Sequence, residues 1–256
     1  MNEYINKVIN GDCIEVLKQL PENSVDLIVT SPPYNKHSAN RKCGSSDSWQ
    51  KANINYDGFD DNLDESVYQA QQREVLRECL RVLKRTGSIF YNHKARIIKH
   101  ATIFPHEWLG GFIVRQMVVW NRKATPMLEP IRFMPITEYI FWITKERTTP
   151  KFNGEAFSYS EIWEIPAQKD NDHPAPFPIE IPLRAILSTT DKDDIVLDPY
   201  GGSGTTAVAA IRTNRNFILI EQSAGYCAIA EKRIKEERNK LAETCYVQDL
   251  ALFGDL

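Results

Sequence analysis

The sequence contains no long apolar run. No uncharged apolar stretch reaches the roughly 18 residues that a membrane-spanning helix requires. The first thirty residues carry Asp12, Glu15 and Glu22, where a signal peptide would carry an apolar segment. We therefore expect a soluble cytoplasmic protein that has no membrane partner.

Cysteine is scarce as well. The 5 cysteines are odd in number and scattered, and no two of them form a C-x-x-C pair. This pattern argues against both a disulfide framework and a zinc site. The isolated histidines His93, His100 and His106 do not have metal-ligand spacing on one helix face, so we expect no metal ion and interpret them as structural or phosphate-facing.

The rest of the composition is typical of a globular protein. Of the 256 residues, 42% are apolar and 25% are charged, and no internal repeat or low-complexity tail interrupts them. This length is sufficient for one large domain with a sizeable core. The formal net charge of -3 at first argues against a polyanionic partner.

Helical and strand-like segments alternate along the chain. The spacing of apolar residues predicts helices at 14–20, 64–85, 183–187, 205–212 and 226–241. Strand-like runs occupy residues 25–30, 88–92, 112–120, 136–144, 195–198 and 217–221. The polar segment 35–62 has no period and is interpreted as a long loop. This alternation predicts one α/β domain, with a mostly parallel sheet that helices cover on both faces.

A glycine-rich turn follows one predicted strand. In Ile195-Val-Leu-Asp-Pro-Tyr-Gly-Gly-Ser-Gly-Thr-Thr206 the strand ends in an acidic residue, and the glycines then lead into a helix. Glycines let the backbone approach a ligand closely, and the amides that open a helix favour a negatively charged group. The next strand ends in Glu221, which could accept hydrogen bonds from a ribose. No Lys follows Gly204, so this is not a Walker loop, and a tight turn without a ligand remains the alternative.

A double proline follows another predicted strand, in Val25-Asp-Leu-Ile-Val-Thr-Ser-Pro-Pro-Tyr-Asn35. The two prolines restrict the backbone and leave the carbonyls of Ser31 and Pro32 as rigid acceptors. Tyr34 adds an aromatic ring beside them. Such a group could hold a planar, amine-bearing ring by stacking and hydrogen bonding, although a strand that simply ends in Pro-Pro is the alternative.

Together and in this order, the two motifs resemble the β-class of amino DNA methyltransferases, which transfer a methyl group from S-adenosylmethionine to an exocyclic base nitrogen. The matching blocks span nearly the whole chain: Gly11-Asp12-Cys13, Ser24–Tyr34, Glu78–Lys84 with Gly87, Trp120–Lys123, Thr137–Lys145, His173–Pro178, Asp198–Thr206, and Glu221 with Tyr226, Ala230 and Arg233. The resemblance implies a Rossmann-like methyltransferase domain with a seven-stranded sheet. It also implies a circular permutation, in which the catalytic half precedes the cofactor half.

The resemblance assigns roles to individual residues. The catalytic group that grips the target base would be Ser31, Pro32, Pro33 and Tyr34. The S-adenosylmethionine site would comprise Asp12 at the adenine, Glu221 at the ribose, and Thr30, His173, Pro174, Asp198, Pro199, Gly201, Ser203, Gly204 and Thr205. Many relatives have Lys where Phe177 stands, and the Phe side chain cannot make the polar contact of a Lys. Pro199-Tyr200, in place of the commoner Pro-Phe, is a conservative difference.

The same resemblance divides the single domain of residues 1–256 into five parts. Residues 1–34 form the catalytic block, 35–62 a mobile polar loop, and 64–146 the central sheet with the DNA-facing segment. Residues 147–172 form a short recognition connector, and 173–245 the cofactor-binding half.

The identity of the target base depends on Ser31. Adenine-modifying relatives more often have Asp or Asn at this position, so we expect methylation of cytosine N4, with adenine N6 as the alternative. Methylation of a ring carbon would require a nucleophilic Cys, and Cys13 and Cys43 lie outside the catalytic block. A non-catalytic DNA-binding or cofactor-binding regulator, and a methyltransferase of RNA or protein, remain alternatives of other classes.

The expected partner is double-stranded DNA, which the enzyme reads from its loops. The candidate contacts are Lys36, Arg41, Lys42, Lys94, Arg122, Lys123 and Arg132. The segment from Arg81 to Lys151 contains 13 Lys and Arg against 4 Glu, so we expect it to form the DNA-facing side despite the negative total. We expect a bacterial restriction-modification system with a cognate endonuclease, and leave a homodimer open.

Overall fold

We describe the computed structural model of the chain over residues 1–35, 62–98, 101–123, 133–147, 149–167 and 178–253. Its helices are α1 (Cys13–Gln19), α3 (Glu65–Val82), α4 (Glu180–Thr189), α5 (Thr205–Arg212) and α6 (Ala224–Phe253), with 3-10 turns η2 (Pro105–Glu107) and η3 (Gly154–Ser158). Its strands are β1 (Lys7–Asn10), β2 (Val25–Thr30), β3 (Leu83–His93), β4 (Arg96–Ile98), β5 (Ala101–Ile103), β6 (Ile113–Asn121), β7 (Thr137–Thr144), β8 (Ile162–Glu164), β9 (Ile195–Asp198) and β10 (Asn216–Glu221).

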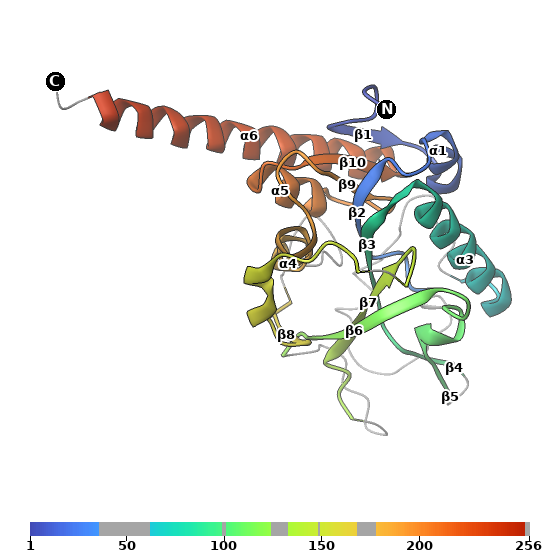
Figure 1. Cartoon of the computed structure of the whole chain (residues 1–256). Helices are drawn as coiled ribbons and strands as arrows, with labels where there is room; N and C mark the ends of the chain where they lie inside the picture. Colours follow the sequence, from blue (N-terminus) through green and yellow to red (C-terminus); the bar gives the residue numbers. More distant parts are fainter. Residues whose placement is uncertain (36–61, 99–100, 124–132, 148, 168–177, 254–256) are drawn as a thin grey trace, which may run out of the picture.

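One large sheet forms the centre of the molecule (Figure 1). Its strand order is β1-β10-β9-β2-β3-β7-β6-β8, and the strands from β1 to β3 are all parallel. β7 runs antiparallel to both of its neighbours, while β8 is parallel to β6. The mostly parallel sheet is thus confirmed, but the described residues contain eight strands in it rather than seven. The additional pairing comes from the short edge strand β8, which has only 3 residues and therefore shows no clear period in the sequence.

Helices cover both faces of this sheet (Figure 1). Alternate residues of β10, and of β2 beyond the register shift between Val25 and Leu27, face opposite sides, as the two-residue period of a strand requires. Val25 and Ile28 pack in one apolar cluster with α1 and α3, whereas Leu27 and Val29 pack in the other with α4, α5 and α6. The predicted α/β architecture is therefore confirmed.

The end of α3 differs from the prediction. The helix ends at Val82, and β3 begins at Leu83 instead of Ser88, so Gly87 is a strand residue and not the helix stop that its position suggested. Pairing of Leu83 with Val25 of β2 draws this segment into the sheet. A Cβ atom at Gly87 would lie 2.7 Å from the Asp26 carbonyl oxygen, so close packing in the sheet explains the glycine.

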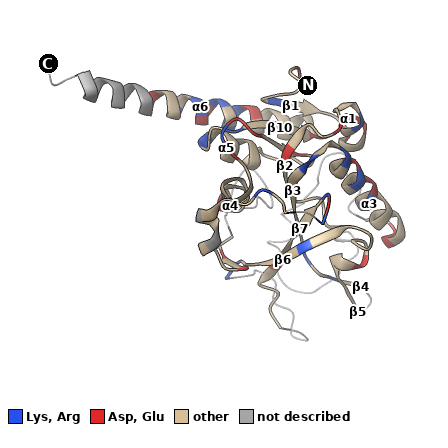
Figure 2. Cartoon of the chain, viewed as in Figure 1, with Lys and Arg blue, Asp and Glu red and all other residues tan. Residues whose placement is uncertain are grey.

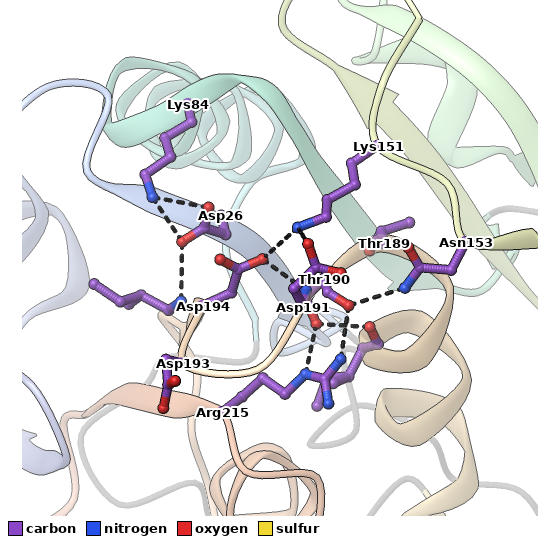
Figure 3. Close-up of polar contacts among 12 residues, drawn as sticks. Asp26, Lys84, Lys151, Asn153, Thr189, Thr190, Asp191, Asp193, Asp194 and Arg215 are labelled. Atoms are coloured by element: carbon purple, nitrogen blue, oxygen red, sulfur yellow. Dashed lines mark hydrogen bonds and ion pairs between the residues drawn. The ribbon is translucent and has the colours of Figure 1, made fainter.

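The edge of the sheet where β2 and β9 begin is held by polar contacts (Figure 3). Asp26 pairs with Lys84 at 2.8 Å and accepts the Ile195 amide at 3.0 Å. Lys151 pairs with Asp191 and Asp194, and Arg215 donates to the carbonyl and hydroxyl of Thr190. These contacts hold Lys151, which precedes α4 in the chain, against the residues before β9. They lie at the amino ends of the parallel strands, whereas Ser31 lies at the carboxyl end of β2.

Within the ranges that the structure describes, no helix is long and apolar enough to cross a membrane. The same ranges contain no group of three or more His, Cys, Asp or Glu side chains that could hold a metal ion.

Candidate active site

The strand order brings five chemically important segments to one edge of the sheet. The carboxyl ends of β1, β10, β9, β2 and β3 lie in that order along the sheet. Glu221 and Asp198 are the last residues of β10 and β9, and Asn92 is the second-last residue of β3. Asp12 and Ser31 follow the ends of β1 and β2. In an open α/β sheet, ligands bind at this edge. The two motifs, which are more than 160 residues apart in the sequence, therefore meet at neighbouring strands β2 and β9.

The glycine-rich turn between β9 and α5 requires its glycines. Gly202 and Gly204 have φ angles of 49° and 85°, in the left-handed region that L side chains rarely adopt. At Gly204 a Cβ atom would also lie 3.0 Å from the Cβ atom of Ala230 on α6. The turn therefore presents bare backbone at the start of α5, where exposed amides favour a negatively charged group.

Glu221 lies beside this turn at the end of β10. Its two carboxylate oxygens accept the backbone amides of Gly202 and Ser223, each at 2.8 Å. These bonds orient the carboxylate, and each oxygen keeps further lone-pair capacity for hydroxyl donors. A ribose at the predicted position would meet an acceptor that the backbone already holds in place.

Asp198 faces inward rather than toward a ligand. It is 1% exposed, and its oxygens accept the Tyr200 amide at 3.1 Å and the Thr206 hydroxyl at 2.7 Å. Burial raises the pKa of Asp198 to about 6, although the hydrogen bonds from Thr206 and Tyr200 oppose this shift. Its geometry shapes the turn, and direct contact with the methionine part of a cofactor stays a prediction.

Ser203 and Thr205 are bonded to Arg233 of α6. The guanidinium donates to the Ser203 carbonyl at 2.7 Å, to its hydroxyl at 2.6 Å, and to the Thr205 hydroxyl at 3.3 Å. Both side chains are buried. The side chains of these two predicted ligands therefore stabilise the turn through Arg233. The backbone of the turn is the part that we expect to contact a ligand.

The other predicted cofactor residues differ in position. Asp12 caps α1, with its Oδ1 accepting the Ile14 and Glu15 amides at 2.9 and 3.1 Å. Thr30 and Pro199 are buried at the ends of β2 and β9. His173 and Pro174 lie outside the described residues, as does Phe177.

These groups suit a nucleoside-containing cofactor that has an anionic end. Glu221 offers acceptors for hydroxyl groups, and the turn of Gly201, Gly202 and Gly204 offers close backbone approach. Gly201 also packs tightly, since a Cβ atom there would lie 2.3 Å from Leu219 Cγ. The chemistry of this set of donors and acceptors fits S-adenosylmethionine.

The Ser-Pro-Pro-Tyr segment lies next to that site, and its side chains belong to a buried network. The Tyr34 hydroxyl lies 2.7 Å from Ser31 Oγ and donates to Glu138 Oε2 at 3.0 Å. Asn92 Nδ2 donates to the Tyr34 oxygen at 2.8 Å, to Glu138 Oε2 at 3.0 Å and to Ser31 Oγ at 3.3 Å. Arg122 donates to the other Glu138 oxygen at 3.0 Å. We call Ser31, Tyr34, Asn92, Glu138 and Arg122 the Tyr34 network.

A second set of contacts supports the double proline. The Tyr68 hydroxyl donates to the Pro33 carbonyl at 2.8 Å and lies 2.6 Å from His93 Nε2. The His93 ring also lies against Tyr34, with 4.6 Å between ring centroids. Burial lowers the pKa of His93 well below its usual value, so the ring is neutral. This confirms the structural interpretation of His93, whereas His100 lies outside the described residues.

Cys13 does not fit the role of the nucleophile that methylation of a ring carbon would require. Burial raises the pKa of the Cys13 thiol to about 12, so the thiol stays protonated and is a poor nucleophile. Cys43 lies outside the described residues.

Asn35 and Leu63, which flank the undescribed residues 36–61, contact each other. Asn35 has a φ angle of 50° and is 1% exposed. Its side chain donates to the Leu63 carbonyl at 2.9 Å and accepts the Leu63 amide at 2.8 Å. The chain therefore leaves and re-enters the core beside the Ser-Pro-Pro-Tyr segment.

The predicted DNA contacts are only partly described. Lys94 lies near the Ser-Pro-Pro-Tyr segment, with its Nζ 5.6 Å from the Tyr34 ring centroid. Lys123 pairs with Glu164 at 3.0 Å and is half exposed, whereas Arg122 is engaged by Glu138 and the Pro135 carbonyl. Lys36, Arg41, Lys42 and Arg132 lie outside the described residues. Contact of any of these seven residues with DNA stays a prediction.

Some described cations of the segment from Arg81 to Lys151 lie away from Ser31, so they do not belong to the single DNA-facing side that we expected. Figure 2 shows basic and acidic residues side by side along α3 and near β2. Many of its cations pair with acidic groups that are distant in the sequence, as Lys84 does with Asp26, and Lys151 with Asp194. Those two lie at the edge of the sheet opposite Ser31. The excess of positive charge between residues 81 and 151 is partly offset in the folded protein, because acidic residues from outside this segment pair with its cations.

Comparison with known proteins decides the family. The family model described as DNA methylase, of the N6/N4 methyltransferase class, matches residues 25–232. The chain belongs to this family of DNA methylases. The type II methyltransferase M.BglII of Bacillus subtilis is 30% identical to it over 92% of this chain and 70% of the relative. M.HinfI of Haemophilus influenzae, also a type II methyltransferase, is 28% identical over the same shares.

Solved structures agree with this assignment. The protein TTHA0409 of Thermus thermophilus, in complex with S-adenosyl-L-methionine, is 26% identical with a TM-score of 0.66, covering 91% of this chain and 94% of that chain. The cytosine-N4-specific PvuII DNA methyltransferase has a TM-score of 0.70 over 91% of each chain. At 23% identity, it supports the fold alone. The expected family and the mostly parallel α/β fold are thus confirmed, and the enzyme is a DNA methyltransferase. The expected circular permutation stays a prediction.

Three residues of the site, Asn92, Glu138 and Tyr68, escaped the sequence analysis. Asn92 closes a predicted strand, and Glu138 is a carboxylate inside an apolar strand. Both positions carried a signal, since side chains at strand ends and charges in buried strands are informative. Tyr68 had no such signal, because its position on an amphipathic helix is that of an ordinary core residue.

Proposed function

We propose that this DNA methylase transfers a methyl group from S-adenosylmethionine to the exocyclic N4 amine of cytosine in duplex DNA. The observation that carries the proposal is the position of Ser31, whose hydroxyl belongs to the Tyr34 network at the end of β2, next to the glycine-rich turn after β9. A Ser hydroxyl can accept a hydrogen bond from an exocyclic amine, and the adenine-modifying relatives more often have Asp or Asn at this position, which favours cytosine.

The mechanism starts from the weakness of the nucleophile. The lone pair of an exocyclic amine is delocalised into the ring, so the nitrogen attacks poorly. Hydrogen bonds from the amine to Ser31 Oγ and to the Pro32 carbonyl draw the nitrogen toward tetrahedral geometry and localise that lone pair. Stacking on Tyr34 orients the base, and positioning accounts for much of the rate.

The cofactor, when bound, supplies a methyl group on a positively charged sulfur, which is a strong electrophile with a good leaving group. Glu221 would hold its ribose, Asp12 its adenine, and the glycine-rich turn its methionine end. The target base must leave the helix to reach Ser31, at a cost of a few kcal/mol for unstacking.

The experiment is methylation of mixed-sequence duplex DNA by the full chain, followed by digestion to nucleosides and mass spectrometry. We expect N4-methylcytosine, with transfer abolished by Tyr34→Ala and by Pro32→Ala. Formation of N6-methyladenine alone would overturn the cytosine proposal. Absence of transfer to DNA, with RNA and protein substrates offered in parallel, would instead favour the regulator or the other substrate classes.

Adenine N6 is the second candidate. One relative, YhdJ of Escherichia coli strain K12, is named a DNA adenine methyltransferase and is 25% identical to this chain, covering 92% of it and 85% of the relative. The same mass spectrum distinguishes the two bases.

The proposal also extends to the biological setting. The type II relatives support a role in a bacterial restriction-modification system with a cognate endonuclease. A cytoplasmic location follows from that role. Sequencing of modified sites in the genome of a host that expresses the chain would report the base and the recognition sequence together. Sedimentation at micromolar concentration tests the homodimer.

A further inference from the structure

We propose that Glu138 is a positioning residue that makes Ser31 a hydrogen-bond acceptor toward the target amine, acting through the Tyr34 hydroxyl. This inference rests on the proposed function. It concerns the direction of hydrogen bonds inside the Tyr34 network, which the described contacts determine.

The direction begins at Glu138. This side chain is 5% exposed, and Arg122 and Asn92 both donate to it, so it is held as an acceptor-only carboxylate. Its Oε2 lies 3.0 Å from the Tyr34 hydroxyl. A hydrogen bond to a carboxylate is stronger than one to a neutral hydroxyl, so the single hydroxyl hydrogen of Tyr34 goes to Glu138.

That assignment determines the next bond. The contact of 2.7 Å between Tyr34 and Ser31 allows either oxygen to donate. Since Tyr34 has given its only hydrogen to Glu138, Ser31 is the donor in this contact. Its hydrogen therefore points toward Tyr34, and its lone pairs are directed elsewhere.

Asn92 reinforces the same arrangement. Its amide is oriented by Glu138, because turning it over would place Oδ1 against the carboxylate. Its nitrogen has two hydrogens for three nearby acceptors, and the longest contact, 3.3 Å, is the one with Ser31. Ser31 thus retains accepting capacity for an amine hydrogen of the flipped base.

The substitution Glu138→Gln tests this direction with little change of shape. Arg122 requires an acceptor, so the new amide oxygen stays with Arg122 and the amide nitrogen faces Tyr34. Tyr34 then receives a hydrogen bond and gives its own hydrogen to Ser31, which reverses the polarity of the Ser31 contact. We expect the single-turnover rate of methyl transfer to fall about 10- to 100-fold, a range typical of lost transition-state positioning.

A purely structural role of Glu138 predicts a different pattern. Under our proposal, the dissociation constants for S-adenosylhomocysteine and for duplex DNA change less than about twofold in Glu138→Gln. In a double-mutant cycle, Glu138→Gln causes no further loss of rate in the Tyr34→Phe background, because the Tyr34 hydroxyl through which Glu138 acts is absent. Equal losses in both backgrounds would overturn the inference.

A matched control is Glu146→Gln, which alters another Arg-paired glutamate away from the site and is expected to keep the wild-type rate. Should Glu138→Gln fail to fold, Glu138→Asp enters the same cycle, since the shortened carboxylate cannot reach both Arg122 and Tyr34. If the wild-type chain methylates no DNA, the proposed function fails. If it methylates DNA but the cycle is additive, only the role of Glu138 fails.

Discussion

Two buried carboxylates of the site have different partners. Glu138 has the Arg122 guanidinium at 3.0 Å, whereas Asp198 accepts from a backbone amide and a hydroxyl. A cation compensates the loss of water around Glu138, while neutral donors compensate it only partly at Asp198. Burial is the largest cause of the raised pKa of Asp198, which is about 6 against an ordinary value of 3.8.

The raised pKa predicts a pH dependence of stability. The folded state binds the Asp198 proton more tightly than the unfolded state, so the contribution of this group falls as pH rises from about 4 to about 6 and is constant above. A pKa difference of this size corresponds to about 3 kcal/mol. Urea unfolding at several pH values should show this change in the free energy of unfolding of the wild type relative to Asp198→Asn. A difference between the two proteins that does not vary over this pH range would contradict it.

At the scale of elements, α6 supports a turn that belongs to two other elements. Arg233 reaches from α6 to Ser203 and Thr205, and Gly204 allows close packing against Ala230. The glycine-rich turn between β9 and α5 is thus held from behind by a helix that follows it in the chain. Figure 1 shows α6 crossing this side of the sheet and extending beyond it.

Removal of that support should loosen the turn. We expect Arg233→Met to weaken binding of S-adenosylhomocysteine about tenfold, because the loss of charge-assisted hydrogen bonds frees the Ser203 backbone. Isothermal titration calorimetry measures the effect. Lys232→Met, which removes an exposed cation from the same helix turn, is the control and should bind normally.

The packing of Gly201 against β10 gives a stability prediction. A Cβ atom at this position would lie 2.3 Å from Leu219 Cγ, so Leu219 must shift. We expect Gly201→Ala to lower the free energy of unfolding by about 1–3 kcal/mol, as overpacking does. Gly154→Ala, where a Cβ atom meets nothing within 4 Å, should change it by less than about 0.5 kcal/mol in the same urea titration.

At the scale of the whole molecule, ion pairing redistributes the charge that the sequence suggested for DNA binding. Lys84 and Lys151 lie at the edge where β2 and β9 begin, opposite Ser31 (Figure 3), whereas Lys94 Nζ lies 5.6 Å from the Tyr34 ring centroid. A count of Lys and Arg along the chain therefore overestimates the number of phosphates that the protein contacts.

The salt dependence of DNA binding distinguishes a cation near Tyr34 from a cation that lies away from it. Loss of one phosphate contact lowers the slope of log K against log salt by about 0.9. We expect that reduction for Lys94→Met. Arg85→Met, which removes a side chain that is 74% exposed but pairs with Glu146, should leave the slope unchanged. Fluorescence anisotropy between about 50 and 200 mM salt measures both, and equal slopes for the two variants would contradict the assignment.

Much of the fold was predictable from local patterns. The bounds of β2, β9 and α5 agree with the prediction, because apolar runs and the prolines or glycines that flank them are local signals. The strands β1, β4, β5 and β8 were missed, since runs of 3 or 4 residues carry little periodicity; β9 is as short but is marked by the glycine-rich turn that follows it. Folding also extended β3 into the predicted end of α3, where pairing with β2 outweighed the helical pattern.

The sequence by itself determined the two motifs and their family, and it predicted the roles of Ser31 and Tyr34, because these depend on residue type and short spacing. Only the tertiary structure decided that Asn92, Glu138 and Arg122 join them, and that Ser203 and Thr205 face Arg233. The physical reason is strand order. Hydrogen bonds act over about 3 Å, and which distant segments come that close depends on sheet pairing, which local periodicity does not encode.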